Sequence, residues 1–551
     1  MKLRFTLVLI LFCSLPAFAQ SWTTKLDKDI RFYQTTEMGI VLAGTEKSLY
    51  AIDGSSGQIL WRRKDTSLDE TGVAPVPGTD LLLLSFDKGD KARIEAVDLL
   101  TGDSIWRSEK IKGAVMQTSV DPSNNLLAIV LAKDVKNRAR DGFKRRPLLH
   151  VLDLASGDEL WKYEAGEVEM MPARWPEDSD KEVDYTLDNY YPPVFIDGRL
   201  YAFYEGVTSF DARSGKEHLR EKYRVNEDGL ALTEAEPIFS EGFIYVSGHG
   251  RVRAISRQSG DTEWEAKDLG LTPEMILVGD VLYVRTGGQF TRLKDGESIE
   301  RGSYGVSAID TRSGKVLWRY KGADKGITNL LLLGRNTIAL ADRDDLIFLD
   351  ASTGKRTLRV SHKIERPSFG LLNERGDIVI GGQNEIAAFS GGRELWHARH
   401  TPPGRGILRT IGAIAARAAS LYFRFSGPGL TAFRAAAAFS NLQSLATFAT
   451  RNQKAPPLSR FNRYGIAARQ LDRLSRFLWH RERLATVRGQ WMYFYTNLDS
   501  GGNGLAGVNV NNGRTDREIR ISDLDERFIT DEVLGSMITA SGETLISRGL
   551  H

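Results

Sequence analysis

The sequence predicts an all-β protein of the β-propeller class, built from four-stranded antiparallel blades. Three observations lead to this prediction. One turn-and-strand unit recurs along most of the chain, the segments between its copies alternate like further strands, and helical periodicity is absent from Ser21 to about Trp396. A radial repeat explains such recurrence better than chance does, because several copies stand at intervals of roughly 40–60 residues.

The clearest copy of the unit is "GVSAIDTRSGKVLWRY", from Gly305 to Tyr320. Asp310 ends an apolar run, and its carboxylate can accept hydrogen bonds from backbone N–H groups of the following turn. Gly314 supplies the positive φ that completes the turn. Trp318 offers a large apolar surface and one N–H donor, which suits a wedge between neighbouring blades. These are structural roles, and none of them is catalytic.

Further copies keep all or part of this spacing. They place Asp, Gly and Trp, or substitutes for them, at Asp53, Gly57 and Trp61; Asp98, Gly102 and Trp106; Asp153, Gly157 and Trp161; Asp211, Gly215 and Leu219; Ser256, Gly260 and Trp264; Asp350, Gly354 and Leu358; Ser390, Gly392 and Trp396; and Asn509, Gly513 and Arg517.

These copies resemble the pyrroloquinoline-quinone-type propeller repeat. That repeat occurs in quinoprotein dehydrogenases and in non-enzymatic envelope propellers, among them the β-propeller lipoprotein of the outer-membrane-protein assembly machine, which this chain resembles more. The resemblance covers most of Trp22 to Trp396 and, more weakly, the last ~60 residues. It implies eight blades, the usual number in these families, although counting units along the chain gives nine or ten.

The N-terminus has the features of a secretory signal peptide. Lys2 and Arg4 precede an apolar core that is too short to span a membrane, and "AFA" precedes Gln20. We expect cleavage after Ala19 and therefore an exported protein of the periplasm or cell envelope. The one cysteine, Cys13, follows Phe12 rather than the small residue that a lipoprotein signal needs, so we expect no lipidation.

Two long loops carry opposite charge. The segment 133–147 is basic, and the segment 174–193 is acidic, with Glu177, Asp178, Asp180, Glu182 and Asp184. Calcium binding would need several oxygen ligands that converge, and the spacing lacks the central Gly of the helix-flanked calcium loop. We therefore interpret both as solvated loops, and either could also contribute to a contact surface.

The composition changes after Trp396, where residues 395–471 contain no Asp or Glu. This part is rich in Ala and predicts helices, and Arg recurs in it and just beyond, at Arg399, Arg405, Arg409, Arg417, Arg424, Arg434, Arg451, Arg460, Arg463, Arg469, Arg473 and Arg476. Three interpretations remain open: a helical subdomain packed on the propeller, helices lying on an anionic membrane surface, or a docking element for a protein partner.

These boundaries give four segments. Residues 1–19 form the signal peptide, 20–398 the propeller blades, 399–489 the Arg-rich helical insertion, and 490–551 a return to the propeller with a closing blade. Three strands are predicted near the C-terminus, and the fourth strand of that blade could come from the N-terminus around "SWTTKLD". Such a closure would remove exposed sheet edges.

No catalytic constellation is evident. His397 and His400 form an H-x-x-H pair without further ligands, so we predict no metal site there. The dehydrogenases that share the repeat bind pyrroloquinoline quinone with calcium, but no stretch of this chain matches their calcium ligands or their aspartate base. We therefore expect no cofactor, no catalytic residues and no cofactor-binding residues that can be named.

The sequence therefore predicts a non-enzymatic propeller that acts as a scaffold or protein-interaction module at the cell envelope. The alternatives are a quinone-dependent dehydrogenase or its cofactor-binding relic, and a sugar- or ligand-binding propeller. An envelope protein is the expected partner, with peripheral membrane contact through the Arg-rich helices as an addition. The formal net charge is only +3, so we expect no nucleic-acid partner.

Overall fold

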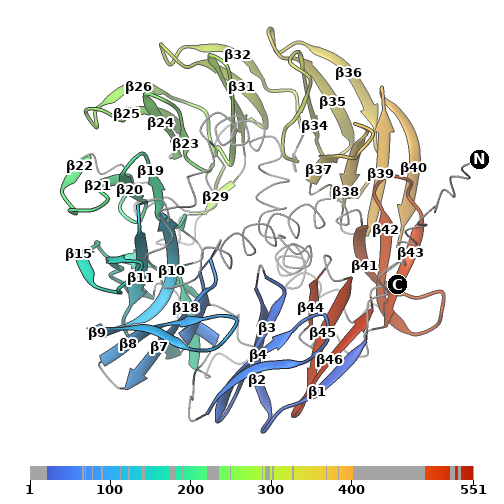
Figure 1. Ribbon diagram of the computed structural model, residues 1–551. Helices are drawn as coiled ribbons and strands as arrows, with labels where there is room; N and C mark the ends of the chain where they lie inside the picture. Colours follow the sequence, from blue (N-terminus) through green and yellow to red (C-terminus); the bar gives the residue numbers. More distant parts are fainter. Residues whose placement is uncertain are drawn as a thin grey trace, which may run out of the picture.

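The computed structural model describes most of residues 21–400 and 491–549; the longer stretches left out inside these ranges are 173–181, 220–234, 292–297 and 521–527. The described strands form a ring of ten antiparallel blades (Figure 1). Nine of the ten blades have four described strands, and the remaining one has three. Apart from the short η1, the part of the chain described consists of strands, turns and irregular segments.

The first five blades follow one another in chain order. Blade 1 contains β2 (Ile30–Thr35), β3 (Ile40–Thr45), β4 (Ser48–Asp53) and β5 (Ile59–Lys64). Blade 2 contains β6 (Val73–Pro75), β7 (Leu81–Lys88), β8 (Lys91–Asp98) and β9 (Ser104–Ile111), and it is preceded by η1 (Glu70–Gly72). Blade 3 contains β10 (Ala114–Asp121), β11 (Leu126–Ala132), β14 (Leu148–Asp153) and β15 (Glu159–Glu164). Blade 4 contains β19 (Val194–Ile196), β20 (Arg199–Ala202), β21 (Thr208–Asp211) and β22 (Glu217–Leu219). Blade 5 contains β23 (Ile238–Phe239), β24 (Phe243–Gly248), β25 (Arg251–Ser256) and β26 (Thr262–Ala266).

The other five blades complete the ring. Blade 6 contains β27 (Glu274–Val278), β28 (Val281–Thr286), β31 (Gly305–Asp310) and β32 (Val316–Tyr320), with a separate hairpin of β29 (Gln289–Thr291) and β30 (Ser298–Glu300). Blade 7 contains β33 (Leu331–Leu333), β34 (Thr337–Ala341), β35 (Asp345–Asp350) and β36 (Arg356–Ser361). Blade 8 contains β37 (Phe369–Leu372), β38 (Ile378–Gly381), β39 (Glu385–Ser390) and β40 (Arg393–Arg399). Blade 9 contains β41 (Trp491–Asn497), β42 (Asn503–Asn509) and β43 (Thr515–Arg520). Blade 10 contains β44 (Phe528–Asp531), β45 (Ser536–Ser541), β46 (Thr544–Gly549) and β1 (Trp22–Lys25).

The recurring turn has the predicted construction. The carboxylate of Asp310 accepts hydrogen bonds from the backbone N–H groups of Arg312 at 3.2 Å and Ser313 at 2.8 Å. Gly314 has a φ of +69°, and its N–H donates to the carbonyl of Asp310 at 2.9 Å. The turn thus reverses the chain between β31 and β32, and the carboxylate of Asp310 is occupied in holding it.

The tryptophan of one blade joins the next blade. The indole N–H of Trp264, in blade 5, donates to the carbonyl of Thr311 in the turn of blade 6 at 2.8 Å. A Cβ added at Gly314 would lie only 2.6 Å from the same indole ring, so no larger residue fits there without a shift. The same tie recurs from Trp61 to Leu99, Trp106 to Leu154, Trp161 to Ala212, and Trp318 to Ala351. The core of the protein therefore lies between blades, where each sheet packs face to face on its neighbours.

Blade 10 confirms the prediction that the two ends of the chain share one blade. β1 pairs antiparallel with β46, and the register places Trp22 opposite Ser547. Trp22 then serves as the repeat tryptophan of this blade, because its indole N–H donates to the carbonyl of Gly54 in blade 1 at 2.8 Å. In Figure 1 the blue β1 lies beside the red β46.

The eight blades that the family resemblance implied are too few, and the count of nine or ten units along the chain agrees with the ten blades present among the described residues. Even the worn copy at Asn509 and Gly513 forms a hairpin, between β42 and β43. Each blade meets only its two neighbours, so added units enlarge the ring without changing the local packing. The predicted signal peptide, residues 1–19, and residues 401–489 of the predicted helical insertion lie outside the described residues.

Candidate interaction face

Most of the long connections between described strands begin and end on one face of the ring. Strand direction alternates in an antiparallel blade, so connections after the first and third strands emerge on one side, which we call the turn face. Connections after the second and fourth strands emerge on the other side, the connection face. On the turn face no link between successive strands of a blade exceeds five residues. Four of the five longest links begin and end on the connection face: 133–147, 165–193, 220–237 and 287–304.

Two of these links, in blades 3 and 4, form a structure of their own. The basic segment contributes β12 (Lys136–Arg138) and β13 (Lys144–Arg145). The link that follows blade 3 contributes β16 (Val168–Glu169), β17 (Met171–Pro172) and β18 (Glu182–Thr186). β18 pairs with both β12 and β17, and β13 pairs with β16. We call these five short strands the platform.

The platform has a packed interior. Tyr185 is fully buried, and its ring stacks on that of Phe143 with 4.0 Å between the centroids. The backbone N–H of Tyr185 donates to the carbonyl of Val135 at 2.9 Å, and that of Met170 donates to the carbonyl of Phe143 at 2.9 Å. Phe143, Tyr185, Val135 and Met170 share one apolar cluster with residues of blades 3 and 4. The platform is therefore anchored to the ring.

Arg145 holds the two ends of the basic segment together. Its Nε donates to the carbonyl of Lys133 at 3.1 Å, and its Nη2 donates to the carbonyl of Asp134 at 3.1 Å. The guanidinium carbon lies 4.1 Å from the centroid of the Phe143 ring, a cation–π distance. A single side chain thus cross-links the segment, which reduces the entropy that the segment would lose on binding a partner.

The basic and the acidic segment pair with each other through their backbones. The backbone register places Lys136 opposite Asp184 and Arg138 opposite Glu182, and it places Lys144 opposite Glu169. The interpretation of two separate solvated loops is therefore wrong for these parts, because their strands pair with each other. Sequence alone did not reveal this pairing, since the short strands show no alternation. Glu177, Asp178 and Asp180 lie outside the described residues.

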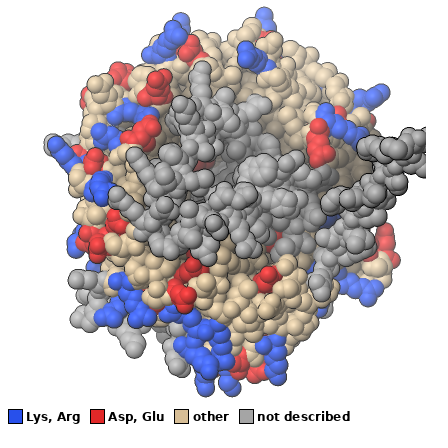
Figure 2. Space-filling model, viewed as in Figure 1, with Lys and Arg blue, Asp and Glu red and all other residues tan. Residues whose placement is uncertain are grey.

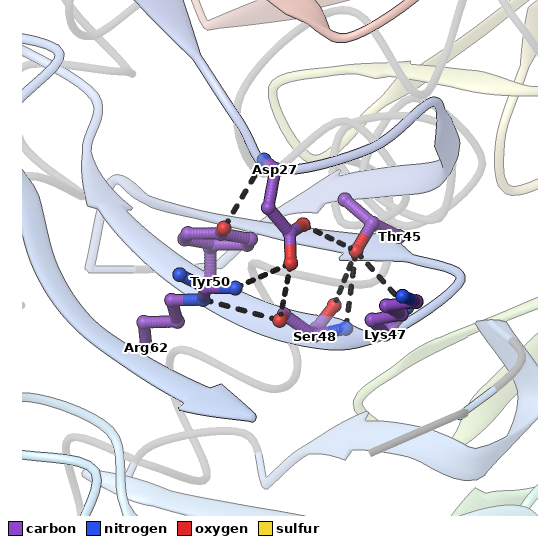
Figure 3. A network of polar contacts seen from close by, with 6 residues as sticks. All are labelled: Asp27, Thr45, Lys47, Ser48, Tyr50 and Arg62. Atoms are coloured by element: carbon purple, nitrogen blue, oxygen red, sulfur yellow. Dashed lines mark hydrogen bonds and ion pairs between the residues drawn. The ribbon is translucent and has the colours of Figure 1, made fainter. Parts of the chain in front are cut away.

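A polar network fixes the ring closure on the same face (Figure 3). Asp27 follows β1, and its carboxylate accepts hydrogen bonds from the Thr45 hydroxyl at 2.8 Å and the Ser48 hydroxyl at 2.8 Å. Arg62 donates to the same carboxylate at 2.5 Å, and the backbone N–H of Asp27 donates to the Tyr50 hydroxyl at 3.2 Å. Burial alone would raise the pKa of Asp27, but these hydrogen bonds and the charge of Arg62 lower it.

The H-x-x-H pair is divided between two environments. Nε2 of His397 lies 2.9 Å from a carboxylate oxygen of the buried Glu385, which also pairs with Arg399. The ring of His400 stacks instead on Phe494 of blade 9, at 5.1 Å between centroids, and burial lowers the pKa of His400. Among the described residues there is no group of three or more His, Cys, Asp or Glu that could hold a metal ion.

The repeat aspartates are occupied by their own turns, as predicted. Hydrogen bonds from the Ser313 side chain and backbone lower the pKa of Asp310, and those from Ser352 and Thr353 lower the pKa of Asp350. These carboxylates therefore stay ionised and accept hydrogen bonds within their own turns.

None of the helices in the described ranges is long and apolar enough to cross a membrane.

The fold and its repeated ties define a β-propeller built from pyrroloquinoline-quinone-like repeats. The model of the family described as outer membrane protein assembly factor BamB matches residues 90–268, 149–300 and 302–453, and the chain belongs to this family. No curated protein sequence matches the chain significantly.

Solved structures with related folds have low sequence identity. BamB from Moraxella catarrhalis is 16% identical, with a TM-score of 0.33, over 68% of this chain and 97% of that one. The computationally designed Ika8 protein is 14% identical, with a TM-score of 0.31, over 68% and 98%. A quinohemoprotein alcohol dehydrogenase from Pseudomonas putida HK5 is 13% identical, with a TM-score of 0.29, over 68% and 72%. At these sequence identities and TM-scores, the similarities give no information about function.

Proposed function

We propose that this protein is an exported, non-enzymatic scaffold of the cell envelope, which binds a protein partner during outer-membrane protein assembly. Membership of a family described as an outer membrane protein assembly factor supports this role. The predicted signal peptide, residues 1–19, supports the location, and the absence of cysteine from residues 20–551 suits an oxidising compartment.

The observation that carries the proposal is the asymmetry of the two faces. Scaffolds commonly bind through long connections held by a rigid framework. Here four of the five longest links begin and end on one face, and the platform on that face is packed and cross-linked by Arg145 before any partner arrives. The repeat carboxylates add no reactive group, because they hold turns on the other face.

The proposal is tested by capturing partners from the host envelope with the intact protein and with a platform variant. Phe143→Ala removes the ring against which Tyr185 and Arg145 pack, so it should loosen the platform and weaken capture of outer-membrane assembly proteins. Leu100→Ser, on an exposed turn of blade 2, serves as the control and should capture normally. Equal capture by the two variants would show that the platform does not bind the partner.

Calcium-dependent quinone binding by the purified protein would support the dehydrogenase alternative instead.

A further inference from the structure

The interfaces between blades combine two apolar side chains. The first is the repeat tryptophan, which packs over the turn glycine of the next blade and which we call the wedge. The second, which we call the plug, belongs to the next blade and directly precedes its repeat Asp, Ser or Asn. In blades 1 to 9 the plug is apolar, at most 2% exposed and part of the apolar cluster shared with the preceding blade. The nine plugs are Ile52, Val97, Leu152, Phe210, Ile255, Ile309, Leu349, Phe389 and Val508.

Blade 10 has an arginine in place of the plug. In blade 1, the plug Ile52 follows the residue that lies opposite the wedge Trp61. In blade 10 the residue at this position, after the strand partner of Trp22, is Arg548. Ile52 is fully buried, whereas Arg548 is exposed.

The face of β46 toward blade 9 is partly open to water. Ile546 and Arg548 lie on this face, where the first is half-buried and the second is exposed. Leu545 and Ser547 lie on the other face, toward blade 1, and both are fully buried. In β4, the equivalent strand of blade 1, residues 48–52 are all buried, so both faces are covered.

Blade 9 has an arginine in place of the wedge. Arg517 occupies this position, and its guanidinium carbon lies 3.4 Å from the centroid of the Trp491 ring in its own blade. Many charged side chains stand along the outer edge of the ring (Figure 2), so an arginine on an outermost strand is in itself ordinary. Arg517 is unusual because other blades place an apolar wedge there. Blade 10 has no repeat turn to accept an indole N–H, because β46 and β1 come from distant parts of the chain.

The apolar clusters follow the same division. Clusters of described residues join nine of the ten pairs of neighbouring blades. Within the part of the chain that the structure describes, blades 9 and 10 are the pair that no such cluster joins. An arginine is costly to bury, so Arg517 and Arg548 favour water at this interface where wedge and plug exclude it elsewhere.

We propose that the ring opens on the turn-face side of the interface between blades 9 and 10, which we call the seam, while the other nine interfaces stay closed. Opening at the seam exposes no wedge and no plug, so it costs less free energy than opening at another interface. Blade 10 stays attached to blade 1, because the wedge Trp22 and its hydrogen bond to Gly54 hold these two blades together. The ring therefore opens one interface away from the blade in which the chain ends meet. This inference does not depend on the proposed partner.

The test is thiol labelling of two single-cysteine variants of the full-length protein. Met537 lies opposite Arg548 on the face toward blade 9, and Ile538, the next residue of β45, packs toward blade 1. Both side chains are at most 1% exposed. Met537→Cys should react about tenfold faster than Ile538→Cys, because only the first site becomes accessible when the seam opens. Labelling of the unchanged protein gives the background from Cys13, the one cysteine of the sequence.

Urea separates opening of the seam from global unfolding, because a reaction that exposes little surface depends only weakly on denaturant. At low urea concentration, the labelling rate of Met537→Cys should therefore change little and that of Ile538→Cys should rise steeply. Equal rates with equal urea dependence would overturn the inference. If Met537→Cys does not fold, Leu505→Cys and Ala506→Cys give the same comparison from blade 9, because these neighbours lie on opposite faces of β42.

A repair variant tests whether the two arginines cause the opening. Arg517→Trp with Arg548→Ile supplies both a wedge and a plug, and it should slow labelling of Met537→Cys about tenfold. Arg514→Trp with Arg520→Ile, at two exposed arginines of blade 9, is the matched control and should leave the rate unchanged. An unchanged rate in the repair variant, or equal slowing in both variants, would contradict the assignment of the seam to Arg517 and Arg548.

Discussion

The indole of Trp264 shows how one residue connects two blades. It is almost fully buried, packs over Gly314 and donates its only polar hydrogen to a backbone carbonyl of the next blade. Trp318 makes the same hydrogen bond but is only partly buried. The sequence predicted both as wedges, yet it could not rank them, because burial depends on the neighbouring blade.

Trp264→Ala should lower the free energy of unfolding by about 3–5 kcal/mol, since it leaves a cavity and an unpaired carbonyl. Trp318→Ala should cost clearly less, because more of its ring already contacts water. Chemical denaturation of both variants measures the difference. A loss below about 1 kcal/mol for Trp264→Ala would contradict the wedge role.

Asp27 should make ring closure sensitive to acid. Its pKa is lower in the folded protein than the usual 3.8, so its contribution to stability is present above that value and is lost as the pH falls through the folded pKa. Asp27→Asn should therefore lower the denaturation midpoint at neutral pH, and its difference from the unchanged protein should shrink in acid. Asp29→Asn, at an exposed neighbour, is the control. A difference that stays constant down to the acid range would exclude the carboxylate network as its source.

His150 should affect stability at a higher pH. It is buried in blade 3, and burial lowers its pKa despite the Glu159 carboxylate 2.7 Å away. The folded protein therefore holds His150 neutral, and stability should fall as the pH drops below its usual value of 6.5. His150→Gln should flatten this part of the stability profile, as measured by denaturation at a series of pH values. If the dependence of stability on pH is unchanged in His150→Gln, other groups cause it.

The platform shows the limit of sequence reasoning at the scale of elements. The unit from Asp310 to Trp318 was predictable, because turn chemistry and strand alternation are local. β12 and β18 were not, because they pair residues far apart in sequence and each is too short to show a period. The opposite charges of the two segments were visible, but nothing local indicated that the segments were partners.

Phe143→Ala should loosen the platform while the blades remain intact. Amide exchange at Tyr185, whose N–H bonds to the carbonyl of Val135, should accelerate, whereas exchange in β11 and β14 should not. Arg146→Ala, at an exposed site with long ion-pair distances, is the control and should leave exchange unchanged. Equal acceleration in the blades would mean that the platform does not unfold separately.

At the scale of the whole molecule, the closing strand was predicted, and the count of nine or ten units along the chain agrees with the ten described blades, whereas the family resemblance gave eight. Three strands near the C-terminus lacked a fourth, and the edge that they would expose indicated a partner strand. The count could not be settled between nine and ten from the sequence, because worn copies such as Asn509 to Arg517 lack the full repeat pattern and yet form hairpins of the ring. The role of Trp22 was missed because no Asp–Gly turn precedes it in the chain.

A disulfide across the closure should stabilise the ring. Thr23 and Ile546 stand directly opposite each other in β1 and β46, and neither side chain is fully buried. Thr23→Cys with Ile546→Cys should form a disulfide and raise the free energy of unfolding by about 2–4 kcal/mol, an effect that reduction should abolish. Failure of the cysteines to pair under oxidising conditions would contradict the observed register.

Site-specific photo-crosslinking in the host envelope tests the central claim, that the connection face binds a protein partner. Crosslinkers at Lys144 and Arg146 report on the platform, and crosslinkers at Gln58 and Arg213 report on the turn face; all four sites are exposed. The account predicts adducts with an outer-membrane assembly protein from the two platform positions and none from the two turn-face positions. Adducts from the turn face alone, or from all four positions equally, would contradict it.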